Sequence, residues 1–244
     1  MNKIPNFLYH YTSIEAVLAI IKSLGNKDNE YNNITLRATH VSFLNDLTEG
    51  CLLPKALVSC GIPERPISIM LCCSGYPFIL SFSELDDDLN MWRCYAQDGK
   101  GVSLSFDTNY FSLDAESRLE ECAYITPEAL KDMLLSKVNL EELRQTGNTL
   151  PLGRFLQDAC KYKDSSFHAE KEWRIIKSGS IDDFRTSEET IIPYAEIKVP
   201  KEALVSIRLG PKCHFDKNAF SLNRLLYKYG MGHVQIEQSD IPLV

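Results

Sequence analysis

The 244-residue sequence lacks any long apolar segment. The longest apolar run near its start, residues 16–21, has six residues. A signal-peptide core needs at least about seven apolar residues, and a helix that crosses a bilayer needs about 20. The sequence therefore predicts neither a signal peptide nor a membrane contact, and it favours a cytoplasmic protein.

The spacing of cysteines that is typical of zinc sites is also missing. The chain has eight cysteines but no Cys-x-x-Cys spacing, and Cys213-His214 stands far from any partner motif. A structural zinc site needs ligands that converge in a tetrahedron, usually from such knuckle spacings. In a reducing cytoplasm, scattered cysteines act as small apolar side chains. We expect no disulfide framework and no metal.

The sequence contains neither a Walker A motif nor a G-x-G-x-x-G loop, so the common phosphate-cradling loops are absent. Its formal net charge is −7 and its pI is about 5.3. Non-specific binding to nucleic acid draws its affinity from clustered Lys and Arg, so the acidic net charge disfavours this function. It does not exclude a local basic groove.

Periodicity predicts an α+β fold in a single domain that spans residues 1–244, because strand patterns occur at both ends and helices cluster between them. A capping box formed by Thr12 and Glu15 is expected to begin the first helix. The segment 43–46 is expected to lead into a second helix, and the acidic run 86–88 to begin a third. The alternation of apolar residues and serines at 102–106 predicts a half-buried strand. A helical insertion is expected at 127–165. The strands are expected at 7–11, 34–38, 67–73, 78–83, 102–106, 172–177, 190–199, 205–209 and 234–237.

Glu170 and Glu172 stand at the start of an expected strand, where alternate residues share a face. Two carboxylates on one face repel each other unless a cation binds between them or one takes a proton. The pair is a candidate for acid/base work or for stabilising an oxocarbenium ion. The alternative is a solvated strand edge, with Lys171 and Arg174 as counter-charges.

Two further patterns are candidates for a binding site. His10 lies in an aromatic strand and is expected to face away from Tyr9 and Tyr11, where it could equally be a hydrogen-bonded core residue. Ser81 and Ser83 flank Phe82 and would line one side of a cleft, although plain strand alternation gives the same pattern.

The sequence resembles the uncharacterised bacterial family catalogued as domain of unknown function 2971, and this resemblance extends over nearly the whole chain. The residues that carry it are 9–12, 43–46 with Glu49, 81–84, Met91-Trp92 with Tyr95, 101–106, 170–174 and 209–211.

The order of His10, the Ser81-Phe82-Ser83 motif and the Glu170-Lys171-Glu172 motif also resembles the layout of ADP-ribosyltransferases. In that fold, a split mixed sheet places an Arg or His, a Ser-x-Ser or Tyr, and a Glu-x-Glu on separate strands around NAD. The resemblance implies an enzyme that cleaves the nicotinamide glycosidic bond of NAD and transfers ADP-ribose to a protein or nucleic-acid acceptor. The resemblance also implies that the protein acts as a bacterial toxin or a phage-defence effector, with a cognate inhibitor protein.

On this resemblance, His10 contacts the NAD ribose or phosphates, with Tyr11 and Thr12 beside it. Ser81 and Ser83 hold the nicotinamide pocket. Glu172 stabilises the oxocarbenium ion, and Glu170 orients or deprotonates the acceptor. Enzymes with these motifs usually carry Arg where this chain has His10, which leaves transfer and plain NAD hydrolysis both open.

Two other classes of function stay open. A non-catalytic binding domain of the same fold would leave the two glutamates exposed and tolerant of substitution. A Mg²⁺-dependent nuclease or nucleotide hydrolase would bring the acidic run 86–88 and the glutamates within reach of one metal ion.

Overall fold

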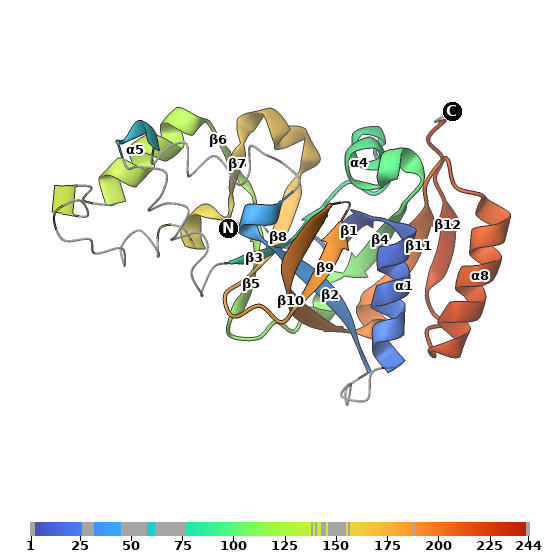
Figure 1. Cartoon of the computed structure of the whole chain (residues 1–244). Helices are drawn as coiled ribbons and strands as arrows, with labels where there is room; N and C mark the ends of the chain where they lie inside the picture. The colour runs from blue at the N-terminus through green and yellow to red at the C-terminus, as the bar shows by residue number, and fades with distance from the viewer. Residues whose placement is uncertain are drawn as a thin grey trace.

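The computed structural model describes residues 3–25, 32–44, 58–61, 77–137, 157–187 and 189–242, with the single positions 139, 141, 142, 145 and 155. It has the expected α+β composition: helices flank a large mixed sheet (Figure 1). The strands are β1 (Phe7–Thr12), β2 (Asn33–His40), β3 (Phe78–Ser83), β4 (Val102–Asp107), β5 (Ser117–Glu121), β6 (Ala123–Ile125), β7 (Tyr162–Asp164), β8 (Glu172–Lys177), β9 (Asp183–Ser187), β10 (Thr190–Pro200), β11 (Leu204–Leu209) and β12 (Gln235–Gln238). The main helices are α1 (Ile14–Lys22), α4 (Leu89–Tyr95), α5 (Pro127–Lys137) and α8 (Phe215–Lys228).

The large sheet runs in the order β12-β11-β4-β1-β3-β2-β10-β9, and β8 joins β3 to β5 outside this path. All its printed pairs are antiparallel except β11 with β12. In Figure 1, α8 lies at one end of the molecule and α5 at the other, with α1 beside the sheet between them.

The sheet splits along one edge of β3. β1 pairs with β3 only at Tyr9–Ser83, near one end of β3. β2 pairs with it only at the other end, through Thr39–Ile79 and His40–Phe78. β1 and β2 thus diverge across the middle of β3. The backbone polar groups there need other partners, because unpaired groups away from water are costly.

The core fills one side of this split sheet. Leu8, Leu36, Phe82 and Trp173 belong to one cluster, which also includes apolar side chains of α1, β4, β10, β11 and α8. Buried apolar area of this kind supplies the main favourable free energy of folding. The core therefore holds β1, β2 and β3 in the positions that leave the split open.

Most expected elements match the structure within one or two residues, and some details differ. Ser13, not Thr12, caps α1, because its side chain accepts a hydrogen bond from the Ala16 amide. β4 is buried on both faces, including Ser103 and Ser105, rather than half-buried. The expected helix after 43–46 and the expected strand 67–73 lie largely or wholly outside the described residues.

The expected helical insertion at 127–165 is helical in part. α5 covers its first 11 residues, but Tyr162–Asp164 form β7, which pairs in parallel with β6 in a separate two-stranded sheet. Neither β5, β6, β7 nor β9 was expected, because these short segments have no clear alternation of apolar and polar residues.

Candidate functional site

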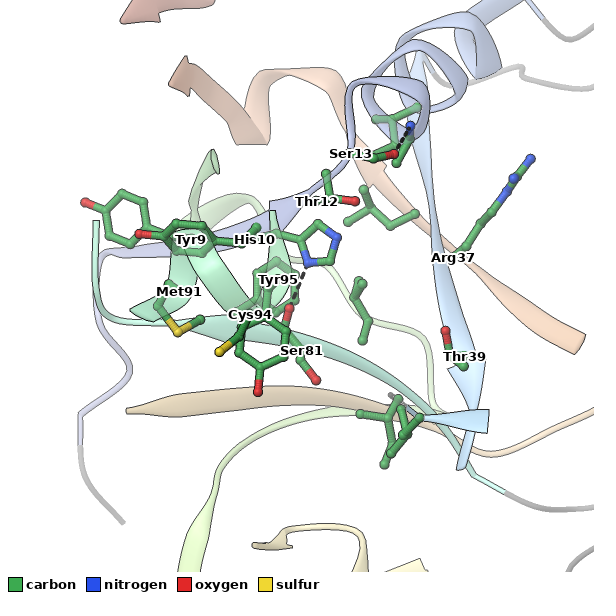
Figure 2. Close-up of a pocket in the computed structure, with 18 of the residues that line it drawn as sticks. Tyr9, His10, Thr12, Ser13, Arg37, Thr39, Ser81, Met91, Cys94 and Tyr95 are labelled. Atoms are coloured by element: carbon green, nitrogen blue, oxygen red, sulfur yellow. Dashed lines mark hydrogen bonds between the residues drawn. The ribbon is translucent and has the colours of Figure 1, made fainter. Parts of the chain in front are cut away.

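A cavity of about 750 Å³ opens between the diverging parts of β1, β2 and β3. Residues from α1, α4, β8 and β9 complete its lining. Figure 2 shows side chains from β1, β2, β3 and α4 around this hollow. The volume lies within the range of about 300–1,000 Å³ that is typical of small-molecule sites.

His10 enters the split from β1. Its Nδ1 lies 2.8 Å from the main-chain oxygen of Ser81, which falls in the part of β3 between the pairing segments of β1 and β2 (Figure 2). A carbonyl oxygen only accepts hydrogen bonds, so Nδ1 carries the proton. Burial lowers the pKa of His10 below its ordinary value of 6.5. The ring is therefore neutral at pH 7, and its Nε2 is an acceptor.

Thr12 and Tyr11, the other residues of β1 that are expected to bind the cofactor, differ from His10 in their surroundings. Thr12 lines the cavity beside Ser13 at the start of α1. Tyr11 also lines it, but its hydroxyl donates to the carbonyl oxygens of Leu85 and Asp86. Tyr11 thus supports the 85–88 loop, and its hydroxyl is already occupied.

Ser81 lines the cavity, whereas Ser83 does not. Ser83 is fully buried, and its hydroxyl donates to the Glu170 main-chain oxygen at 2.6 Å while accepting from the Leu85 amide at 3.0 Å. Its position ties β3 to the segment that carries the glutamates. A direct contact between Ser83 and a ligand does not fit this placement.

Glu170 and Glu172 both line the cavity, and Lys163 from β7 joins them. The Lys163 Nζ lies 2.5 Å from Glu170 Oε2 and 2.7 Å from Glu172 Oε2. The side chain of Lys163 is only 2% exposed. A cation thus binds between the two carboxylates, which is one of the two ways to relieve their repulsion.

The route by which the two glutamates meet differs from the expected one. Glu170 ends a 3₁₀ helix (Ser165–Glu170), and β8 begins only at Glu172. Lys171 between them adopts a left-handed conformation with φ of 45°. A turn and the bridging Lys163, not strand alternation, bring the carboxylates together.

Arg174 completes the charged cluster, which we define as Lys163, Glu170, Glu172 and Arg174. Its Nε donates to Glu172 Oε1 at 2.8 Å, and its other nitrogens reach Glu172 Oε2 and the Cys160 carbonyl. Burial alone would raise the pKa of Glu172, but Arg174 and Lys163 lower it to about 2. Glu172 is therefore a carboxylate at neutral pH. The prediction that this motif forms a solvated strand edge is wrong, because Glu172 and Arg174 are only 4% and 2% exposed.

Two tyrosines hold the charged cluster against the cavity wall. The Tyr95 hydroxyl on α4 donates to Glu170 Oε1 at 2.8 Å. The Tyr124 hydroxyl on β6 accepts from the Glu172 amide at 2.7 Å. Glu170 keeps 15% of its side chain exposed, against 5% for Glu172. Glu170 is therefore the carboxylate more open to a ligand.

Two arginines line the β2 and β9 side of the cavity. Arg37 is exposed and lies over the Tyr194 ring, 4.7 Å from its centroid. Arg185 donates to the Thr39 hydroxyl at 3.2 Å. Neither forms an ion pair with any residue that the structure describes. Outside the charged cluster, the charged residues that line the cavity are these two arginines and Glu15, so this part of the lining carries a net positive charge although the chain as a whole is acidic.

The acidic run 86–88 serves the structure instead. Asp88 caps α4, and Asp86 pairs with Arg208 at 3.0 Å. Asp87 accepts from the Trp92 indole and from the Ser239 hydroxyl. Among the described residues, no group of three or more His, Cys, Asp or Glu side chains could hold a metal ion. A two-metal or one-metal nuclease site built on these aspartates is not supported.

Some further cavity residues have a recognisable pattern in the sequence, and others have none. On β2, Thr35, Arg37 and Thr39 alternate with buried apolar residues, so alternation predicts a polar face, and all three line the cavity. Tyr95 follows Trp92 at helical spacing, a pattern typical of core residues, but its hydroxyl donates to Glu170. Lys163 stands in a three-residue strand, and nothing in its local sequence marks it.

No helix within the described ranges is long and apolar enough to cross a membrane.

No curated protein and no solved structure matches the chain significantly. A family model described as "Protein of unknown function (DUF2971)" matches residues 91–175. The matched segment runs from α4 into β8, and it contains Tyr95 and all four residues of the charged cluster. Through this segment, the resemblance of the chain to the DUF2971 family is confirmed.

Proposed function

We propose that the cavity binds NAD and cleaves its nicotinamide glycosidic bond, with ADP-ribose passing to a protein or nucleic-acid acceptor or to water. The observation that carries this proposal is the convergence of His10, Ser81, Glu170 and Glu172 on one cavity. These residues come from β1, β3 and the start of β8, which are separate segments of the chain. Their order resembles the ADP-ribosyltransferase layout, with His10 in the place where enzymes with these motifs usually carry Arg.

The two glutamates have different capacities in this reaction. Glu172, with its pKa of about 2, stays ionised, so it stabilises positive charge that develops on the ribose. A carboxylate held this strongly is a poor proton acceptor. Glu170 contacts one cation of the cluster where Glu172 contacts two, and it is more exposed. Glu170 is therefore the better base toward an acceptor.

The reaction balances with these groups alone. The bond between ribose C1′ and the nicotinamide nitrogen breaks, and its electron pair stays on nicotinamide, which leaves as a neutral ring. A nucleophilic oxygen or nitrogen of the acceptor, or water, forms the new bond to C1′. The proton of an acceptor nucleophile passes to Glu170 and then to solvent, whereas a water that attacks C1′ loses its proton directly to bulk water. No general acid is needed, unlike in most glycosidases.

A second candidate is a binding domain without turnover. The burial of Glu172 contradicts the exposed glutamates expected for this class, but the contacts of the Glu172 carboxylate favour it. Both Glu172 oxygens already accept hydrogen bonds from Arg174 or Lys163. A carboxylate occupied in this way also stabilises the fold, and a buried ion cluster of this kind is compatible with a purely structural role. This candidate predicts that NAD or a related nucleotide binds without being cleaved.

The test is nicotinamide release from NAD by the full chain, with labelled NAD to detect a modified acceptor. Glu172→Gln should lower turnover about a hundredfold or more with a much smaller change in NAD affinity. Glu170→Gln should impair transfer and spare hydrolysis. Glu120→Gln is the matched control, because Glu120 pairs with Arg118 at 2.6 Å but does not line the cavity.

Each outcome discriminates between the candidates. Binding of NAD without nicotinamide release, with acceptors present, would favour the binding domain. Equal turnover in the wild type and in a folded Glu172→Gln variant would end the proposed mechanism.

A further inference from the structure

The cavity has two chemically different ends. At one end lie the charged cluster, which contains two cations and two carboxylates in direct contact, and His10. At the other end lie Arg37 and Arg185, two cations without an ion-pair partner among the described residues. A ligand that binds across the cavity therefore meets balanced charge at one end and excess positive charge at the other.

We propose that Arg37 and Arg185 form an anion subsite that binds the phosphate groups of the ligand, and that His10 binds a hydroxyl or amino donor instead of phosphate. This inference rests on the proposed function only for the identity of the whole ligand. The anion subsite itself follows from the side chains that line this part of the cavity.

The two arginines lie on strands of one sheet, close enough for their charges to interact. β10 separates the two strands that carry them, because it pairs with β2 on one side and with β9 on the other. Tyr194 of β10 lies under the Arg37 guanidinium, and Thr39 of β2 accepts from Arg185. Stacking and a single hydrogen bond leave most of the guanidinium donors available, and such donors match phosphate oxygens in geometry.

Their mutual repulsion indicates what would stabilise them. Burial lowers the pKa of Arg185 first, and the Arg37 charge lowers it further. Two acids lie near the arginines. A hydrogen bond from the Phe184 main chain chiefly lowers the pKa of Asp183, and the Arg37 charge lowers it further; the Asp183 carboxylate also accepts from the Tyr194 hydroxyl. Glu196 of β10 stands directly opposite Arg37 and forms no ion pair with it. Asp183 is exposed and forms no ion pair with either arginine. An anion between the arginines would relieve their repulsion more directly.

His10 has the opposite hydrogen-bond character. Its Nδ1 proton is committed to the Ser81 carbonyl, which leaves Nε2 as an acceptor toward the cavity. A phosphate oxygen is also an acceptor, and two acceptors cannot share a hydrogen bond without a proton. A ribose hydroxyl or an amide donor fits Nε2. His10 thus cannot perform the anion-binding role that an arginine at its position would perform.

Binding of inorganic pyrophosphate to the full chain, measured by titration calorimetry, tests the subsite without any turnover. Arg37→Gln and Arg185→Gln should each weaken it about tenfold, and the double variant more, because each change removes a charged hydrogen-bond donor to the anion. Arg224→Gln is the matched control. It removes the same charge from α8, where Arg224 stacks on Phe220 outside the cavity. His10→Gln should leave pyrophosphate affinity unchanged within about twofold.

Three results would overturn the inference. The first is a wild type that does not bind pyrophosphate. The second is a double variant that binds it as tightly as the wild type. The third is a loss in His10→Gln as large as in the arginine variants. Arginine-dependent binding of pyrophosphate with no cleavage of NAD would instead retain the subsite and reject the proposed function.

Discussion

The molecule contains two groups of acidic side chains, and they differ in whether their carboxylates face a cavity. The run 86–88 is the more conspicuous in the sequence, yet its carboxylates are occupied by a helix cap, an indole, a hydroxyl and Arg208. Glu170 and Glu172 are also paired, but they line a cavity. Exposure to a cavity, rather than the density of charge, distinguishes a candidate site from a structural cluster.

The two groups are nevertheless connected. Asp88 caps α4, and α4 carries Tyr95, whose hydroxyl donates to Glu170. The structural acids thus fix a helix that positions one candidate catalytic carboxylate. This arrangement predicts that changes in the two groups have different effects, which the following experiments measure.

The largest effect is expected for Glu172→Gln on stability. The variant leaves Lys163 and Arg174 buried with Glu170 as the only anion of the charged cluster. Removing one partner of a buried ion pair costs about 3–5 kcal/mol of unfolding free energy. Urea unfolding measures this loss. A second change, Lys163→Met, restores the charge balance and should recover part of it.

The pH dependence of stability provides a control on this explanation. The pKa of Glu172 is lowered from 4.5 to about 2 on folding. Its contribution is therefore fully present above about pH 4.5 and is lost as the pH falls through about 2. The wild type should lose more stability over this window than Glu172→Gln does. Parallel stability curves for the two proteins would contradict the role of the ion pairs.

A smaller effect is expected for Asp88→Ala. The Asp88 carboxylate accepts from the Asn90 and Met91 amides at 2.9 and 3.1 Å, and loss of such a cap costs about 1 kcal/mol. Asp88→Ser should retain most of the stability, because serine also caps helices. Thermal unfolding of both variants measures the difference. Equal losses in Ala and Ser variants would show that capping is not what Asp88 contributes.

The comparison also shows how much the sequence could reveal. Alternation and helix periodicity predicted β3 and β8 at their observed ends, and the order of His10, Ser81 and Glu172 predicted residues that do line one cavity. These patterns are local, or they depend only on residue type and order.

What could not be predicted depends on contacts between distant segments. Lys163 joins the glutamates because β7 pairs with β6, and a three-residue strand leaves no periodic pattern. Arg185 lies at the cavity because β9 extends the sheet beyond β10, and the split depends on where β1 and β2 leave β3. Such pairings arise from the whole fold rather than from any one segment.

The smallest expected effect concerns His10 and the pH dependence of ligand binding. Burial lowers the pKa of His10 below 6.5, and the charge of Arg185 lowers it further. The ring is neutral at pH 7 and gains a proton only when the pH falls below 6.5, the ordinary pKa of histidine. Protonation turns Nε2 from an acceptor into a donor, so a ligand hydroxyl loses its partner. ADP-ribose, whose diphosphate is a diester and does not titrate near neutrality, should bind up to about threefold more weakly as the pH falls well below 6.5 than it does at about pH 7.5.

His10→Asn is the matched control for this effect, because the asparagine amide can still donate to the Ser81 carbonyl but has no nitrogen at the Nε2 position and does not titrate. Its affinity for ADP-ribose should be weaker than that of the wild type at neutral pH and nearly independent of pH. Calorimetry at several pH values, with folding checked at each, separates this effect from acid unfolding. A variant that keeps the full pH dependence would assign the titration to another group.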